Sequence, residues 1–350
     1  MQSFTIVLSP CMMRKVCYIL LFLTSVSAYG QLGGRATYQF LNLMSSPRQA
    51  ALGGKIITNY DYDPDSALYN PANINYRMDN QLSVNYVNYL ADINYGTASY
   101  AYLWDRRTQV LHAGITYVNY GSFDGRDENG NATGEFGGSE AALSLGYAIN
   151  IPYTDFYVGA NVKLITSTLA EYTSAGGAID LGLTYNYEDW DLNAAVVVRN
   201  IGTQFTPYVD TIEKLPLEID AGISQIVPNV PIRWHLTLEN LQLWNIAFEN
   251  EARGTTDLDG NTTAEKIGVL DNVIRHTIVG VELFPRGGFN LRLGYNFRRS
   301  EELRIINQRS FAGISAGFGI KINKMRFNYA YARYNSAAAS SFFGIGIDLQ

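Results

Sequence analysis

The chain has 350 residues, a formal net charge of −6, and 25 Tyr, 16 Phe and 32 Gly, with 17% charged residues. An acidic chain without a basic patch argues against nucleic acid as a partner. Its mean hydropathy of −0.07 excludes a bundle of membrane-spanning helices. It does not exclude membrane strands, in which each lipid-facing residue is averaged with a polar neighbour.

Residues 1–30 are predicted to be a signal peptide. Arg14 and Lys15 precede the apolar run Val16–Ala28, and small residues at Ala28 and Gly30 fit a signal peptidase site, leaving Gln31 as the new amino terminus. The alternative is a membrane anchor, but the run is shorter than the ~20 residues that a spanning helix needs.

The two cysteines, Cys11 and Cys17, both lie in this segment. The mature chain is therefore expected to have no disulfide, thiolate nucleophile or cysteine metal site. Cys17 precedes the apolar run, which argues against a lipoprotein cysteine. The open start positions are Met1, Met12 and Met13.

Residues 31–80 do not alternate and are predicted to form a plug or hatch inside a barrel. Ser46–Gly54 and Asp63–Ala72 are punctuated by proline and glycine, with possible helix caps at Ser46 and Asp65. A disordered periplasmic tail is the alternative. The content of Leu, Ile, Phe and Tyr in this segment argues against disorder.

Residues 81–350 are predicted to form one transmembrane antiparallel β-barrel, making the fold all-β. The stretch Phe289–Phe297, FNLRLGYNF, places Phe, Leu and Tyr on one face and Asn, Arg and Gly on the other. An aromatic-rich apolar face opposite a charged, glycine-containing face indicates lipid outside and a polar lumen. Fourteen strands are expected near 81–91, 94–104, 108–120, 138–149, 155–168, 174–187, 190–202, 215–226, 231–242, 271–284, 288–298, 311–321, 323–334 and 341–349.

The connections between these strands alternate in length. Short ones such as Glu188–Asp189 and Pro285–Gly287 alternate with long ones such as Gly121–Gly137 and Leu243–Leu270. Bacterial outer-membrane barrels have short periplasmic turns, long outer loops and an even strand number. The chain is therefore expected in the outer membrane with both termini in the periplasm.

Charged residues at the wet positions of the strands are expected to face the lumen, because one Arg or Lys at the lipid midplane costs ~2–4 kcal/mol. His235 beside Arg233 and Glu239 could be an acid–base cluster or a set of pairs that holds the barrel rigid, and the second interpretation is favoured. The predicted lumen network comprises Asp180, Glu218, Asp220, Arg233, His235, Glu239 and Arg292, with Glu282, Arg326 and Asp348 on the same face.

No catalytic constellation stands out, so an enzyme is not expected. His112, His235 and His276 have no metal-ligand spacing, and no GxSxG motif occurs. Asp127–Gly130 and Asp257–Gly260 resemble calcium loops only faintly, lacking the Glu at position twelve. No metal or cofactor is expected.

The longest connection, Leu243–Leu270, is a candidate partner-binding loop. Trp244 and Phe248 precede an acidic stretch, and an aromatic anchor within a polar rim is typical of protein-binding patches. The alternative is that both rings belong to the aromatic girdle at the membrane surface.

Two stretches of the predicted plug carry a family resemblance. The first contains Ser46, Pro47, Arg48, Gly53 and Gly54, and the second contains Asp65, Asn70, Pro71 and Ala72. Together they resemble the amino-terminal signature of the long-chain fatty-acid transporter superfamily, which includes hydrocarbon transporters and barrels of the type IX secretion system. Tyr38–Leu43, Asp271–Glu282 and Gly317–Lys321 narrow the resemblance to the PorQ family of type IX barrels.

This resemblance implies fourteen strands and a place in the attachment complex of the type IX system of Bacteroidetes. It implies a surface partner like PorZ, with the PorU sortase and the PorV barrel as companions, and no catalytic residue. One alternative is a transporter of fatty acids or other hydrophobic compounds, which needs an apolar pocket and a lateral opening at a kinked strand. Glycines in Ser174–Gly182 permit such a kink. Another alternative is a cargo shuttle like PorV.

Overall fold

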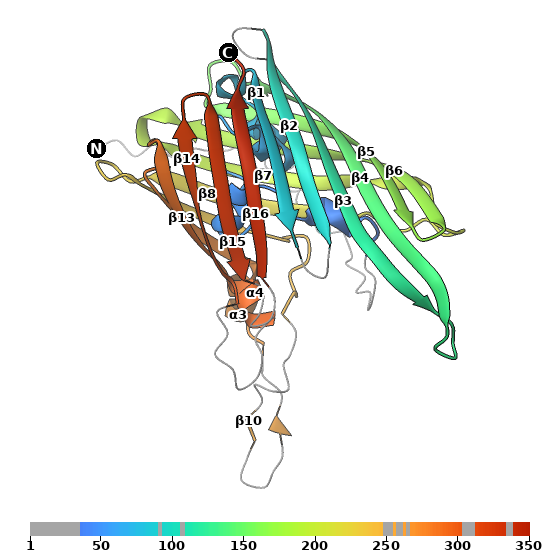
Figure 1. Ribbon diagram of the computed structural model, residues 1–350. Coiled ribbons are helices and arrows are strands. Elements are labelled where there is room, and N and C mark those ends of the chain that lie inside the picture. Colours follow the sequence, from blue (N-terminus) through green and yellow to red (C-terminus); the bar gives the residue numbers. More distant parts are fainter. Residues whose placement is uncertain are drawn as a thin grey trace, which may run out of the picture. The chain divides into compact units, whose positions relative to one another are not determined.

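Fourteen antiparallel strands close into a barrel in the computed structural model (Figure 1). The structure describes residues 36–89, 93–105, 109–247, 255–256, 262–263, 267–302, 312–333 and 339–350. The barrel strands are β1 Gln81–Asn88, β2 Asn94–Asp105, β3 Gln109–Arg126, β4 Ala132–Asn150, β5 Phe156–Leu169, β6 Tyr172–Tyr187, β7 Leu192–Thr206, β8 Glu218–Ile226, β9 Ile232–Leu238, β12 Thr277–Leu283, β13 Phe289–Asn296, β14 Ile314–Ile322, β15 Met325–Arg333 and β16 Ala339–Asp348.

Closure joins the first strand to the last. Val84 of β1 lies opposite Ala98 of β2 on one side and Ile345 of β16 on the other. A closed barrel leaves no exposed sheet edge along its circumference, as a membrane requires. The predicted fourteen-stranded barrel is confirmed.

The two faces of the wall have the polarity predicted from the alternation. On β13, Leu293 points outward and is 56% exposed, whereas the neighbouring Arg292 points inward and is 1% exposed. The inward Glu218 and Asp220 on β8 are fully buried. Exposed leucine outside and buried charge inside is the pattern of a barrel surrounded by lipid.

One predicted strand, 271–284, is wrong in its first part. Residues Val269–His276 form helix α3, and β12 begins only at Thr277. In the helix, Val269, Leu270, Val273 and Ile274 share one exposed face. This spacing is helical, and a prediction based on alternation of every second residue does not detect it. The Gly268 N–H donates to Asp271 Oδ2 at 2.8 Å and so closes the first turn.

The other described elements are short. Helix α4 spans Phe297–Glu302, and β10 (Thr255–Thr256) pairs with β11 (Thr262–Thr263). The 3-10 turn η5 spans Glu188–Trp190. Among the described residues, no helix has both the length and the apolar character needed to cross a membrane.

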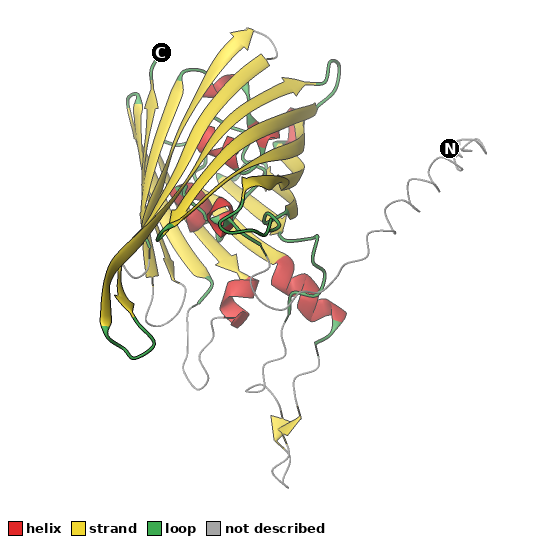
Figure 2. Cartoon of the chain, turned by 90° about the vertical axis from the view of Figure 1, so that its right-hand side faces the viewer, coloured by secondary structure: helices red, strands yellow, loops and turns green. Residues whose placement is uncertain are grey.

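The plug, residues 36–80, packs inside the barrel as a chain of short helices (Figure 2). Prolines begin three of these helices, and the side chains of Asp63, Asn70 and Asn75 accept backbone N–H groups at helix starts. The plug helices are η1 Gln39–Asn42, α2 Pro47–Ala51, η2 Pro64–Leu68, η3 Pro71–Asn73 and η4 Tyr76–Met78.

Glycines on the inner wall let the plug backbone approach the strands closely. A Cβ at Gly294 of β13 would overlap the backbone of Leu52 and Gly53, and one at Gly159 of β5 would overlap Pro71. Gly53 itself has φ +98°, a conformation that only glycine adopts without strain. Wall and plug sequences are therefore matched to each other.

Candidate functional site

Buried charges join the plug to the wall of the barrel in two groups. The first, the Glu282 cluster, consists of Arg48, Asp61, Arg233, Glu282 and Arg292. Glu282 accepts from Arg48 Nη2 at 2.9 Å through Oε2 and from Arg292 Nε at 2.9 Å through Oε1. Asp61 pairs with Arg48 and with Arg233. Strands β9, β12 and β13 are thereby tied to plug helix α2.

The second group, the Glu218 cluster, consists of Lys55, Arg199, Glu218 and Asp220. Glu218 accepts from Lys55 Nζ at 2.6 Å and also from Arg199. Arg199 Nη2 reaches Asp220 Oδ2 at 3.1 Å. Lys55 is the contribution of the plug, and the other three residues come from neighbouring strands β7 and β8.

These ion pairs are buried, unlike pairs on a protein surface, and they position the plug against the wall. The Arg48 and Arg292 side chains are 2% and 1% exposed, and the Glu282 side chain is fully buried. Losing one partner of a buried pair leaves an uncompensated charge and costs about 3–5 kcal/mol. The clusters therefore fix the plug against one side of the wall.

The family-like motif residues of the plug make the remaining contacts. Pro47 begins α2, while the backbone N–H of Ser46 donates to Tyr69 Oη at 3.4 Å. The Asp65 carboxylate accepts from Ser83 Oγ and Asn85 Nδ2 of β1.

Asn70 occupies the junction between plug and strand β6. Its Nδ2 donates to Ile57 O at 2.9 Å and to Thr184 Oγ1 at 3.0 Å, while its Oδ1 accepts from Ala72 N at 3.0 Å. A Cβ at Gly182 would meet Asn70 and Ala72. Gly54 packs in the same way against Ile278 of β12. The motif thus encodes the docking of the plug in the lumen.

The residues predicted for the lumen network all lie on the inner side of the wall, but they do not form one network. Asp180, Glu218, Asp220, His235, Glu239 and Arg292 are buried, and Arg233 is 13% exposed. Arg233 pairs with Asp61 and Glu282 rather than with Glu239. Among the described residues, no hydrogen bond or ion pair joins His235 to Glu239, so the acid–base interpretation gains no support.

Sequence reasoning missed the partners that the plug supplies. Lys55 and Asp61 lie in the non-alternating segment, where no periodicity marks them. Arg199 could have been found, because it follows inward-facing Val197 by two residues on β7.

An irregularity between β6 and β7 holds a further buried ion pair, outside the two clusters. The register shifts between Ile179 and Leu181, so Asp180 faces both Arg199 and Asn200. Asp180 accepts the Asn200 N–H at 2.8 Å and pairs with Lys163 Nζ at 2.7 Å. Asn200 has φ +61°. This is a β-bulge whose extra residue is satisfied by a side chain.

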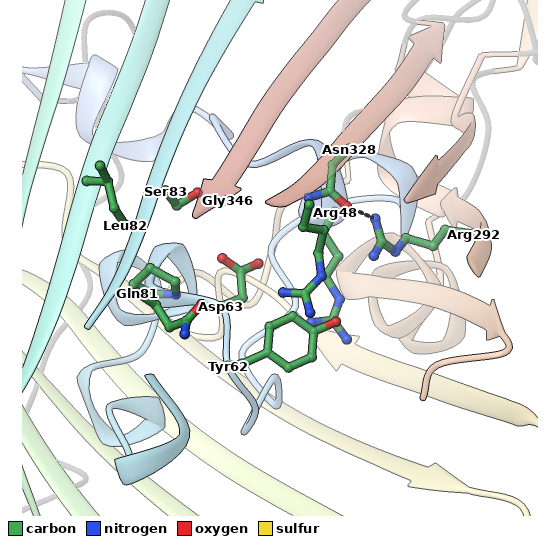
Figure 3. A pocket seen from close by; sticks show the side chains of 11 residues that line it. Arg48, Tyr62, Asp63, Gln81, Leu82, Ser83, Arg292, Asn328 and Gly346 are labelled. Carbon is green, nitrogen blue, oxygen red and sulfur yellow. Dashed lines mark hydrogen bonds between the residues drawn. The ribbon is translucent and has the colours of Figure 1, made fainter. Parts of the chain in front are cut away.

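One lumen cavity is small and lined mainly by polar side chains. It lies between plug and wall and is lined by Arg48, Tyr62, Asp63, Arg292 and Asn328 among others (Figure 3). Its volume is about 20 Å³, room for about one water molecule. A second cavity, beside Phe40 and Lys163, also measures about 20 Å³. Ligand sites for drug-sized molecules occupy about 300–1,000 Å³.

The candidate partner loop is described only in part. Trp244 is 50% exposed, and its ring stacks on His276 with 5.8 Å between centroids. His276 also contacts the carbonyl oxygens of Glu239 and Trp244, which fixes the base of the loop. Phe248 lies outside the described residues.

Comparisons with known proteins give similar barrels at low identity. No protein-family profile matches the chain, and no curated protein matches it. Among solved structures, a TodX monoaromatic hydrocarbon channel mutant is 13% identical over 85% of this chain and 97% of its own, with a TM-score of 0.48. A Pseudomonas aeruginosa FadL homologue is 9% identical over 88% and 99%, with a TM-score of 0.48. The KdgM porin is 7% identical over 77% and 99%, with a TM-score of 0.35.

Proposed function

We propose that this chain is a non-enzymatic outer-membrane scaffold of the type IX secretion system, similar to PorQ. The barrel would hold a PorZ-like partner at the cell surface, together with PorU and PorV. One observation carries the proposal: a plug lies in the lumen, and its buried charges, Arg48 and Lys55, pair with Glu282 and Glu218 of the wall. A plug fixed in this way makes the barrel a rigid scaffold, on which surface loops can bind a partner.

The positions of the end of the plug and of the carboxyl terminus support the orientation that this function needs. Gln81 of β1 lies opposite Asp348 of β16, and Gln350 Nε2 donates to Asp79 Oδ2 at 2.9 Å. The end of the plug and the carboxyl terminus therefore share the rim that carries the short turns (Figure 1). We assign this rim to the periplasm, because periplasmic turns are the short ones.

Deleting the gene in native cells tests the scaffold function. We expect the PorZ-like protein to leave the outer membrane and secreted cargo to appear in the medium instead of on the surface. A pull-down from native outer membranes should recover the PorZ-like protein with the barrel. Cargo that stays attached in the deletion strain would contradict the proposal.

A transporter of hydrophobic compounds is the second candidate, because the bulge in β7 lies opposite Asp180 of the glycine-containing segment Ser174–Gly182, where a kink would open the wall. Two observations oppose it. At the bulge, the Asp180 carboxylate is bound by the Asn200 N–H and by Lys163. The two cavities described above, each of about 20 Å³, are too small for an acyl chain. Loss of uptake of a hydrophobic nutrient in the deletion strain, with cargo attachment intact, would favour the transporter. Direct binding of cargo sorting domains to the purified barrel would favour a PorV-like shuttle.

A further inference from the structure

Strands β3 and β4 continue well beyond the barrel as a two-stranded ribbon (Figure 1). They contain 18 and 19 residues, whereas crossing the membrane takes about 9–11. β2 accompanies β3 only as far as Asn119, and β5 accompanies β4 only from Gly138 onward. Residues 120–137, called here the projecting hairpin, thus have no further strand on either side within the described barrel. At about 3.3 Å per residue, the hairpin reaches roughly 20 Å past its neighbours.

The tip of the projecting hairpin is a well-formed turn. Asp127 Oδ1 accepts the N–H groups of Asn129 at 2.9 Å and Asn131 at 2.8 Å, and Gly130 takes φ +84°. Hydrogen bonds from the Asn131 side chain and from these backbone groups lower the pKa of Asp127 below its usual value. Its carboxylate is therefore occupied in holding the turn, which explains the faint resemblance to a calcium loop.

The two faces of the projecting hairpin differ in character. Phe123 and Phe136 lie directly opposite each other, with ring centroids 5.6 Å apart, and are 41% and 47% exposed. On the other face, Ser122 Oγ donates to Glu135 Oε2 at 2.9 Å. A two-stranded ribbon is only marginally stable in water, so an aromatic pair left exposed on it indicates binding to another molecule rather than a role in folding.

Lipid does not fit this aromatic face. Glu140 of β4 is buried on the lumen side of the wall, and side chains two residues apart share a face. Phe136 therefore continues the lumen side, while Glu135 continues the side that faces lipid lower down. A ribbon lying against the membrane would carry the reverse pattern.

We propose that the projecting hairpin is the docking element for the surface partner, with Phe123 and Phe136 inserting into an apolar pocket bordered by Lys or Arg. The hairpin carries four acidic residues (Asp124, Asp127, Glu128 and Glu135) against the single Arg126, so a basic rim is electrostatically complementary. Clustered aromatic side chains are the usual hot spots of protein interfaces. This inference rests on the proposed scaffold function and adds the contact surface and the chemistry of the partner.

Photo-crosslinking of the full chain in native cells tests the contact. We expect Phe136→benzoylphenylalanine to form one adduct with a surface protein, in a peptide that combines apolar residues with Lys or Arg. The control is the same replacement at Phe343, a lipid-facing residue of β16 with a similar exposure of 48%, which should give no protein adduct. An adduct at residue 136 with lipid or with a second copy of the chain, or no adduct, would overturn the proposal.

Binding of the purified, cross-link-identified partner provides the quantitative test. Phe123→Ser with Phe136→Ser should weaken binding at least tenfold, whereas Ser122→Ala on the opposite face should change it less than threefold. Heat-modifiable migration in gels verifies that each variant barrel is folded. Glu128→Lys at the tip, which leaves the ribbon face untouched, should weaken binding and slow association at low salt. If the double phenylalanine variant and the Glu128→Lys variant both bind the partner as tightly as the wild type does, the hairpin is not the docking site.

The two proposals fail in different ways. If gene deletion releases cargo but the double phenylalanine variant still retains the partner, the hairpin is the wrong surface and the scaffold function stands. If residue 136 cross-links the partner but cargo remains attached in the deletion strain, the docking site stands and the secretion function is wrong.

Discussion

At the scale of single residues, the plug is held to the wall by buried charges, each of which is stable only when its oppositely charged partner is present. Arg48 extends from the plug to Asp61 and Glu282, and Arg292 approaches Glu282 from the neighbouring strand. Each charge is removed from water, so its energy depends on keeping its partners. Such residues hold the plug in one position.

Removing Glu282 should therefore be costly. Glu282→Ala leaves Arg48 and Arg292 buried without their shared carboxylate, and we expect the free energy of unfolding to fall by about 3–5 kcal/mol, measured by urea unfolding in lipid vesicles. The control is Glu188→Ala, whose pair with Arg77 is largely exposed, at 3.3 Å. It should cost about 0–1 kcal/mol. Equal losses would mean that the Glu282 cluster does not stabilise the fold.

At the scale of elements, the plug and the wall are complementary surfaces. Leu52 and Gly53, at the end of α2, contact the backbone of β13 where Gly294 offers no side chain. The strands in turn present leucine and phenylalanine outward, so each element has one face for the plug and one for lipid. Substitutions on the two faces should therefore have different effects.

On the plug side, Gly294→Ala should push α2 away from the wall. Its new Cβ overlaps backbone atoms, which cannot rotate aside, and overpacking of this kind costs about 1–3 kcal/mol. Trypsin should then cleave after Arg48 or Lys55, both nearly fully buried in the wild type. At Gly288 the nearest atom to an added Cβ, Lys321 O, is 3.8 Å away. Gly288→Ala should therefore leave the plug resistant, and equal cleavage of both variants would disprove the close contact.

On the lipid side, the cost of a charge should depend on its depth. Leu293 at mid-strand and Leu349 at the rim are 56% and 57% exposed, so exposure alone cannot separate them. Leu293→Arg should lower the free energy of unfolding by about 2–4 kcal/mol, and Leu349→Arg by about 0–1 kcal/mol. Urea titrations in vesicles measure both. A larger effect at Leu349 would place the membrane elsewhere on the barrel.

At the scale of the whole molecule, an even number of strands returns the chain to the rim from which the barrel began. The short turns, the end of the plug and the carboxyl terminus share that rim, and the projecting hairpin extends from the other (Figure 1). Binding at the cell surface requires the second rim to lie outside.

Single cysteines test this orientation, because the sequence has cysteines only at positions 11 and 17, in the predicted signal peptide. Thr211→Cys, in the exposed connection between β7 and β8, should react with an impermeant maleimide on whole cells. Pro228→Cys, in the exposed turn between β8 and β9, should react only after the outer membrane is broken. Labelling in the opposite order would invert the topology and remove the hairpin from the surface.

Alternation along the sequence was sufficient to predict the number of strands and the direction of their side chains, as Arg292 and Leu293 illustrate. It was insufficient where a helix follows the apolar pattern of a strand, and where a strand continues out of the membrane. Residues 271–276 were expected in a strand but form a helix, and β3, expected to end near residue 120, continues to Arg126. In the projecting hairpin both faces meet water, so the contrast between faces that marks a spanning strand is absent.

By itself, the sequence determined the all-β class, the fourteen strands and the polarity of their faces, because a period of two residues is a local property. Only the tertiary structure decided which charges meet. Arg48 and Glu282 are 234 residues apart in the chain and become neighbours because the barrel closes around the plug. It also decided that Phe123 and Phe136 stand together above the rim, since strand register and the lengths of neighbouring strands are set by pairing across the sheet.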